Sequence, residues 1–183
     1  FRMLPLRLLA LDTSTHLMSV GVRVVCPHTT PTDRQWLHTG EGGAQASAHL
    51  VPAVLALLAQ AGTSLAELDA LVWGCGPGSF TGLRTAAAVA QGLAYGTRPP
   101  RHPNGLPVLS VDTLLAVAEE ARHQHGCTQV VAVLDARMDE VYVAHCEWLP
   151  AQGGTAGHWR TDGDFGLCDP EAVQVPAGCT LAG

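Results

Sequence analysis

The chain has 183 residues, a hydrophobic fraction of 47% and a formal net charge of −6, which is enough apolar material for one ordinary domain or two small ones. All ten basic residues are arginine and are spread along the chain, so the composition excludes a protein that binds nucleic acid through a broad basic face of its own.

Targeting and metal signals are also missing from the sequence. The apolar run before Asp12 is too short for a signal peptide, and glycines, His49 and Pro52 interrupt the uncharged stretch 42–66, so we expect a cytoplasmic protein without a membrane span. The six cysteines form no C-x-x-C pair; we therefore expect reduced thiols and no zinc site.

Residues 6–39 predict three strands, with a turn between the first strand and the second. Residues 6–11 form a short apolar run, and residues 18–24 alternate in the way of a strand with one buried face. Between them Asp12, Thr13 and Ser14 supply hydrogen-bonding side chains typical of a turn. The third strand is predicted at 34–39.

A helix is predicted from about Ala46 to Ala61. Its apolar residues recur at helical spacing on one stripe, formed by Leu50, Val54, Leu57, Leu58 and Ala61. Because proline fits best in the first turn of a helix, Pro52 moves the expected start of regular helix toward His49. Residues 63–67 then predict a short capped turn.

Residues 68–96 predict a buried strand, a glycine turn and a helix of small residues. Gly76 and Gly78 permit backbone angles closed to other residues, Ser79 and Thr81 are candidate N-caps, and Gly96 is a candidate stop. The string matches neither G-x-G-x-x-G nor the P-loop, because Thr81 replaces the third glycine and the chain contains no lysine. A phosphate-binding turn and a purely structural strand-to-helix turn both remain open, and the second is favoured.

The prolines between residues 97 and 105 mark a domain boundary, after which the pattern starts again. We expect a strand at 107–110, a helix from Asp112 or Thr113 to Arg122, and a buried strand at 129–134. A turn at 135–139 and a return strand at 141–146 follow, and this repeats the opening plan. The predicted domains are therefore 3–100 and 105–183.

Three motifs together resemble the TsaB (YeaZ) family. The most specific is Gly76-Pro77-Gly78-Ser79-Phe80-Thr81-Gly82-Leu83-Arg84. The stretch 9–15, with Asp12-Thr13-Ser14, is similar to the opening strand and turn of that family. The stretch 133–142, with Asp135 and Arg137, is similar to its second hairpin. The three matches occur in order and span residues 6–148.

The resemblance implies an α/β fold of the actin-like (ASKHA, ribonuclease H-like) class with two duplicated domains. Members of the family usually run some tens of residues longer, so the resemblance also implies that the second domain is incomplete in this chain. In the related ATPases an aspartate like Asp12 helps to hold metal-bound nucleotide. Here Thr13 replaces the glycine that usually follows, which would crowd a phosphate, so a turn-forming role for Asp12 is favoured.

The resemblance further implies a non-catalytic subunit that dimerises with and activates a TsaD-like catalytic subunit. With a TsaE-like ATPase, such complexes transfer threonylcarbamoyl to N6 of adenosine 37 in tRNAs that read ANN codons. We expect no cofactor of its own, contact with tRNA only through the complex, and self-association in the absence of the partner. The expected interface consists of residues on the two N-terminal helices, namely Leu50, Val54, Leu57, Ala86, Val89 and Leu93.

The alternative is a catalyst, either an ATP-dependent enzyme of actin-like fold or a relative of the M22-type metallopeptidases. TsaD-like chains carry a His-x-x-x-His metal pair just after the strand that follows the glycine helix. The corresponding stretch here, Ser110-Val111-Asp112-Thr113-Leu114, has no histidine, and metal ligation needs several converging donors. The pattern therefore favours the non-catalytic subunit. Asp135 with Arg137 is a candidate catalytic pair, but the favoured interpretation is an ion pair within the turn.

Overall fold

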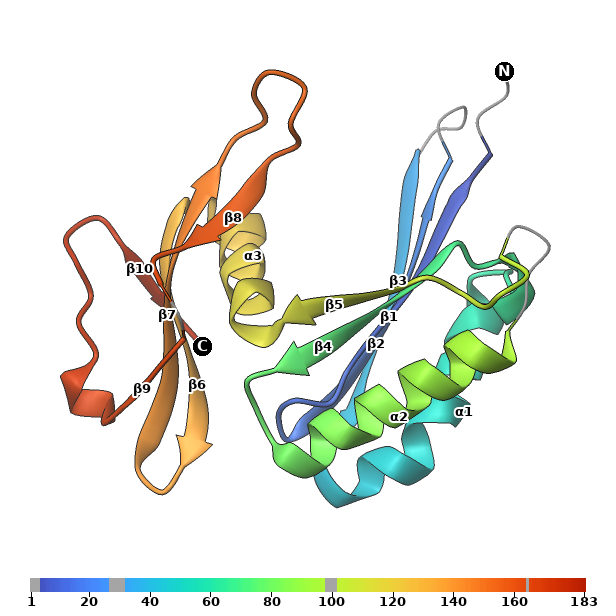
Figure 1. Ribbon diagram of the computed structural model, residues 1–183, viewed down its shortest axis with the longest axis horizontal. Helices are drawn as coiled ribbons and strands as arrows, with labels where there is room; N and C mark the ends of the chain where they lie inside the picture. The colour runs from blue at the N-terminus through green and yellow to red at the C-terminus, as the bar shows by residue number, and fades with distance from the viewer. Residues whose placement is uncertain (1–3, 27–31, 98–101, 164) are drawn as a thin grey trace. The chain divides into compact units, whose positions relative to one another are not determined.

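The computed structural model describes residues 4–26, 32–97, 102–163 and 165–183. The chain forms two compact units, one of Phe1–Cys75 with Ser79–Val111 and one of Gly76–Gly78 with Asp112–Gly183. Figure 1 shows the helices and strands of each unit. None of the described helices is long and apolar enough to cross a bilayer.

A five-stranded sheet with the strand order β3-β2-β1-β4-β5 organises the first unit. Strands β1, β2 and β3 form an antiparallel meander, and β4 joins it parallel to β1. The strands are β1 (Leu6–Asp12), β2 (Leu17–Val25), β3 (Asp33–Glu41), β4 (Ala70–Gly76) and β5 (Val108–Asp112). The three strands predicted before residue 41 are confirmed: β1 is longer by one residue at its end, and β2 and β3 are longer by one or two residues at each end.

Two helices, α1 (Ala46–Gln60) and α2 (Phe80–Gly96), pack against each other and cover one face of this sheet (Figure 1). Short 3₁₀ turns lie at Gly43–Gln45 and Leu65–Glu67. The alternate residues of β2 that face the helices are all buried, namely Met18, Val20, Val22 and Val24. The other residues of β2 point away from the helices, and on that face Leu37 of β3, which pairs with Gly21, is 79% exposed. The period of two in the sequence therefore gives one apolar face that the helices bury.

Helix α1 begins at Ala46, which confirms the predicted start, and the shift of that start toward His49 suggested by Pro52 does not occur. Pro52 lies inside the helix and cannot donate the hydrogen bond that the carbonyl of Ala48 would normally accept. Both residues are exposed, and solvent can reach that carbonyl. The helix tolerates the proline because the missing bond faces water.

The second unit is a sheet of strand order β10-β6-β7-β8, with β9 also paired to β7. Helix α3 (Thr113–His125) packs against β6 and β7. Burial raises the pKa of the Cys146 thiol in this core to about 11, so it is protonated at neutral pH. The strands are β6 (Gln129–Arg137), β7 (Glu140–Leu149), β8 (His158–Thr161), β9 (Gly166–Cys168) and β10 (Thr180–Ala182), with a 3₁₀ turn at Pro170–Ala172.

Strand β5 belongs to the first sheet, whereas the sequence placed it at the start of the second domain. The backbone N–H of Leu71 in β4 donates to the carbonyl of Pro107, at 2.9 Å. The compact units accordingly divide after Val111, and residues 105–111 move from the predicted second domain to the first unit.

A cluster of aromatic and charged side chains ties α3 to the β7–β8 hairpin. The Glu119 carboxylate accepts hydrogen bonds from Arg122 Nε and Nη2, at 2.8 and 2.7 Å, and from Trp159 Nε1 at 2.9 Å. The Arg122 guanidinium lies 4.2 Å from the centroid of the Trp148 ring. Trp148 and Trp159 meet edge to face with centroids 5.5 Å apart. Hydrogen bonds from Arg122, and secondarily from Trp159, lower the pKa of Glu119 below its usual value of 4.5.

This lowered pKa predicts a pH-dependent contribution of Glu119 to stability. A carboxylate with a lowered folded-state pKa stabilises the protein above its ordinary pKa, and the contribution disappears as pH falls through the folded-state pKa. We expect Glu119→Gln to lower the melting temperature at pH 7, and the gap from the unmodified chain to shrink below about pH 4.5. Thermal melts between pH 7 and pH 3 measure this gap. Glu120→Gln removes a neighbouring charge without touching Arg122 or Trp159 and is the control. A gap that stays constant with pH contradicts the assignment.

Candidate functional site

The turn after β1 is held by hydrogen bonds to the Asp12 carboxylate. Asp12 Oδ1 accepts from the backbone N–H of Ser14 at 3.0 Å and from its hydroxyl at 2.6 Å. This arrangement, in which an aspartate caps the backbone two residues ahead, is the turn-forming role that the sequence favoured. Thr13 and Ser14 are 0% and 2% exposed, so the turn is a buried part of the fold.

The same turn binds the start of helix α2. The Thr13 hydroxyl donates to the carbonyl of Gly82 at 2.7 Å, and the N–H of Ser79 donates to the carbonyl of Ser14 at 2.6 Å. A β-carbon on Gly82 would lie 1.8 Å from the carbonyl oxygen of Thr13. Gly82 therefore permits the helix to approach the turn closely, which explains why this position of the motif needs glycine.

Gly74 is a site residue that the sequence reasoning missed. It lies in β4, and a β-carbon there would lie 1.7 Å from Asp12 Oδ2. A glycine inside a predicted strand is the available signal, because it often marks the close approach of another group. The Asp12 side chain occupies the space that any larger residue at position 74 would fill.

The glycine motif itself forms the expected strand-to-helix turn, with two differences in its details. Gly76 has φ of +105°, which glycine adopts more readily than other residues. Ser79 is the N-cap residue, but its side chain makes no capping hydrogen bond. Its backbone N–H donates to the carbonyl of Ser14 in the turn after β1. Thr81, the other candidate N-cap, lies inside the helix. The helix ends at Gly96 as predicted.

Two motif residues on the first turn of α2 are exposed. The Phe80 side chain is 67% exposed, and the Arg84 guanidinium lies 3.7 Å from the centroid of its ring. This cation–π contact attracts the positive guanidinium to the face of the exposed ring.

The third motif forms the β6–β7 hairpin of the second unit. Asp135 Oδ1 accepts a hydrogen bond from the backbone N–H of Arg137 at 2.7 Å. The favoured ion pair is therefore wrong: among the ion pairs of the described residues, none joins the Asp135 carboxylate to the Arg137 guanidinium. Arg137, Met138 and Asp139 have φ of 65°, 56° and 61°, a left-handed run without glycine.

The structure thus brings Asp12, Thr13 and Ser14 together with Ser79 and Gly82 in one packed junction, which we call the β1–α2 junction. The hairpin residues Asp135 and Arg137 belong to the other unit. Within the described ranges, no group of three or more histidine, cysteine, aspartate or glutamate side chains could hold a metal ion.

The predicted partner interface needs correction. Leu50, Val54, Leu57 and Ala86 are at most 2% exposed and belong to the core of the first unit. Val89 and Leu93 are partly buried against that core. Helical periodicity identified an apolar face correctly, but that face packs against the sheet. The large apolar residues exposed on the two helices are instead Val51, Leu55, Phe80 and Tyr95.

The close approach at Gly82 predicts a large effect of one added methyl group. We expect Gly82→Ala to lower the free energy of unfolding by about 1–3 kcal/mol, as overpacking usually does. Gly92 lies in the same helix, and a β-carbon there would meet nothing within 4 Å. Gly92→Ala should therefore raise stability by about 0.5–1 kcal/mol. Urea unfolding of both variants measures the difference, and equal effects would contradict the packing described for the β1–α2 junction.

Comparison with known proteins agrees with the resemblance drawn from the motifs. The family model for TsaD, tRNA N6-adenosine threonylcarbamoyltransferase, matches residues 35–156. The chain is 36% identical over 172 residues to the tRNA threonylcarbamoyladenosine biosynthesis protein TsaB of Escherichia coli (strain K12), covering 92% of this chain and 65% of that protein. It is 38% identical over 169 residues to the Haemophilus influenzae protein of the same name, covering 91% and 65%.

The solved structure of YeaZ from Pseudomonas aeruginosa matches with a TM-score of 0.76 and 36% identity, covering 97% of this chain and 75% of that one. The predicted α/β fold of the actin-like class is confirmed. The chain spans just under two thirds of the length of the two curated relatives, 65% in each case. Because this chain is 36% identical to YeaZ and covers 75% of it, and because the TsaD family model matches more than half of the chain, the chain belongs to the TsaB (YeaZ) family.

Proposed function

We propose that this chain acts in tRNA threonylcarbamoyladenosine biosynthesis as a non-catalytic subunit that dimerises with and activates a TsaD-like catalytic chain. The complex, with a TsaE-like ATPase, would transfer threonylcarbamoyl to N6 of adenosine 37 in tRNAs that read ANN codons. Support comes from relatives that carry the name of this pathway and from the absence of any His-x-x-x-His pair in the sequence.

The proposal rests on the residue composition of helices α1 and α2. Although both helices have an exposed face, they contain a single formally charged residue, Arg84. On the exposed faces Val51, Leu55 and Tyr95 are 37%, 51% and 73% exposed. Protein interfaces are depleted of charge and enriched in aromatic residues at their centre, so this pair of helices has the composition of a partner-binding surface.

The packing of the helices explains how such a surface would act. The inner faces of α1 and α2 are fixed in the core by Leu50, Val54 and Ala86, so the outer faces are presented on rigid elements. Two helices of a partner meeting them would form a four-helix bundle and bury roughly 1,200–2,000 Å². Since the chain has a net charge of −6, contact with tRNA is assigned to the partner.

The β1–α2 junction serves this role by placing α2 firmly on the sheet. The groups that a nucleotide-binding turn would offer to phosphate are engaged within the fold: Asp12 with Ser14, and Thr13 with Gly82. We therefore assign the junction to architecture.

An arginine at position 55 tests the interface. Leu55 is exposed on α1, and Leu55→Arg should abolish both copurification with the TsaD-like chain and self-association of the free chain. Ala86→Arg is unsuitable because Ala86 is 0% exposed and the change would disrupt the core. Leu37→Arg adds the same charge at an exposed leucine on the other face of the sheet, and it should leave both assemblies intact.

Light scattering and copurification measure these outcomes, and thermal melts confirm that each variant is folded. The assignment fails if the free chain is a monomer at every concentration and the TsaD-like chain still binds Leu55→Arg. Equal losses in Leu55→Arg and Leu37→Arg would also contradict it.

The alternative, a catalyst that uses ATP or a metal, is tested on the isolated chain. Because Thr13 is buried with its hydroxyl held by Gly82, we expect at most weak binding of Mg·ATP by calorimetry. Elemental analysis of the purified chain should show no stoichiometric transition metal. Micromolar ATP affinity or one bound metal per chain would favour the alternative.

A further inference from the structure

Arg84 supplies the single formal charge of the surface formed by α1 and α2, and neither helix contains an aspartate or a glutamate. Its side chain is exposed, and its guanidinium lies 3.7 Å from the centroid of the Phe80 ring. Among the described residues, no carboxylate forms an ion pair with Arg84. The charge of this surface is therefore balanced by water and by no acidic side chain of the described residues.

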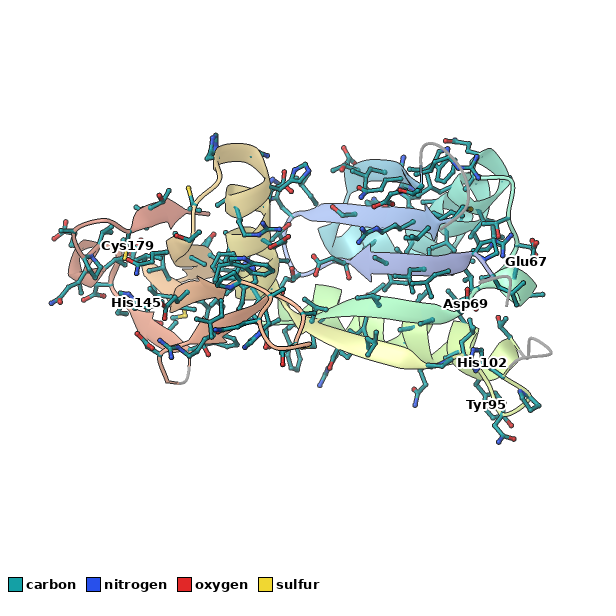
Figure 2. The ribbon with its side chains drawn as sticks, turned by 90° about the horizontal axis from the view of Figure 1, so that it is seen from above. Glu67, Asp69, Tyr95, His102, His145 and Cys179 are labelled. Carbon is teal, nitrogen blue, oxygen red and sulfur yellow. The ribbon has the colours of Figure 1, made fainter. Side chains whose placement is uncertain are left out.

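Arg84 belongs to the exposed stripe of α2. Residues four or seven positions apart share one face of a helix, and the exposed residues Phe80, Arg84, Ala88 and Tyr95 follow this spacing. Tyr95, at the far end of the stripe, points outward from the first unit in Figure 2. A partner that covers this stripe also removes the Arg84 guanidinium from water.

The contact with Phe80 leaves the hydrogen-bond donors of Arg84 available. Helical side chains lean toward the N-terminus of their helix, so Arg84 reaches the ring of Phe80 one turn earlier. A guanidinium is planar and carries its five N–H donors around its edge, in a fork that matches the two oxygens of a carboxylate. The ring holds the charge in place, and the donors can bind an acceptor on another molecule.

A cation that is buried without an acceptor strongly opposes association. We propose that the TsaD-like partner places an aspartate or glutamate carboxylate against Arg84, and that this ion pair selects the complex of two different chains over self-association. The proposal rests on the function proposed above, because it specifies the chemistry of the partner at that same surface.

A second copy of this chain satisfies Arg84 poorly. Two identical surfaces that meet around a twofold axis contribute the same residues. The helices α1 and α2 of a second copy supply exposed Val51, Leu55 and Tyr95, but no carboxylate. Both arginines of such a dimer would lose water without gaining a counter-ion. Because specificity arises when one partner satisfies a group that another leaves unpaired, Arg84 weakens self-association and strengthens the complex with the TsaD-like chain.

The phosphates of tRNA are a different acceptor for an arginine. Proteins that bind nucleic acid through phosphate use several cations along the backbone. Helices α1 and α2 provide one, on a face whose other large exposed side chains are apolar or aromatic. A carboxylate of a protein partner is the better match for one cation among apolar side chains.

Arg84→Leu tests the proposal, because it removes the charge and retains a long apolar side chain. Calorimetry without RNA measures binding to the purified TsaD-like chain, and sedimentation equilibrium measures self-association. The dissociation constant of the complex with the TsaD-like chain should rise at least about tenfold, because the variant leaves the buried carboxylate unpaired. The dissociation constant of the homodimer should fall, because no cation is then buried.

Arg34→Leu is the matched control. Arg34 is also exposed and lies 5.5 Å from the centroid of the Trp36 ring, but it belongs to β3 and not to the two helices. This variant should leave both dissociation constants unchanged. Thermal melts verify folding, and if Arg84→Leu is unfolded, Arg84→Gln decides, because it also removes the charge and should shift both constants in the same directions.

The outcomes separate this proposal from the proposed function. Unchanged binding of the TsaD-like chain to Arg84→Leu, while Leu55→Arg still abolishes that binding, overturns the role of Arg84 alone. A homodimer that Arg84→Leu fails to tighten overturns it as well, and so does a loss of binding that appears only when tRNA is present, which would assign Arg84 to phosphate. If the unmodified chain does not bind the TsaD-like chain, neither the proposed function nor the role of Arg84 holds.

Discussion

The first unit depends on the close contact between the turn after β1 and the start of α2. Thr13 donates its hydroxyl to Gly82, and Ser79 donates its N–H back to Ser14, so two segments more than sixty residues apart in sequence are joined by reciprocal hydrogen bonds. The contact requires glycine at 82 and, through the Asp12 side chain, glycine at 74. This contact between the turn and the helix start sets the position of α2 on the sheet. With α2 in that position, Ala86 and Ala90 are buried and Ala88 and Tyr95 point outward. A buried hydrogen bond of this kind contributes only about 1 kcal/mol net, but leaving its partners unsatisfied costs more, which makes the junction specific.

The same contact explains why a motif with the appearance of a phosphate-binding loop is better understood as architecture. A loop that binds phosphate offers free backbone N–H groups and an unobstructed approach. Here Thr13 fills the approach, and the N–H of Ser79 is already bonded. The function that we propose for the chain therefore relies on the surfaces of α1 and α2, which the junction holds in place, and on no group in the junction itself.

Local patterns predicted most of the elements and few of the contacts. Alternation over 18–24 and the apolar stripe of 50–61 predicted β2 and α1 because each depends on neighbours in sequence. The sheet to which β5 belongs depends on its pairing with β4, near Leu71, and no local pattern encodes that choice. Periodicity likewise located the face of α1 that contains Leu50 and Val54, yet it could not say whether that face meets the core or a partner. Gly74 was overlooked because its partner, Asp12, is distant in sequence. The start of α1 at Ala46 was predicted correctly, and only the suggested shift toward His49 was wrong, because Pro52 was judged without knowing that it faces solvent.

The aromatic cluster of the second unit has an optical consequence. The four tryptophans divide evenly between the units, with Trp36 and Trp73 in the first and Trp148 and Trp159 in the second. The indoles of Trp148 and Trp159 meet edge to face at 5.5 Å, close enough for their electronic transitions to couple. Such a pair gives a two-signed circular dichroism band that vanishes when the rings separate, whereas indoles without such a partner give none. The second unit thus contains a spectroscopic reporter of its own packing, and its unfolding can be followed apart from that of the first unit without any label.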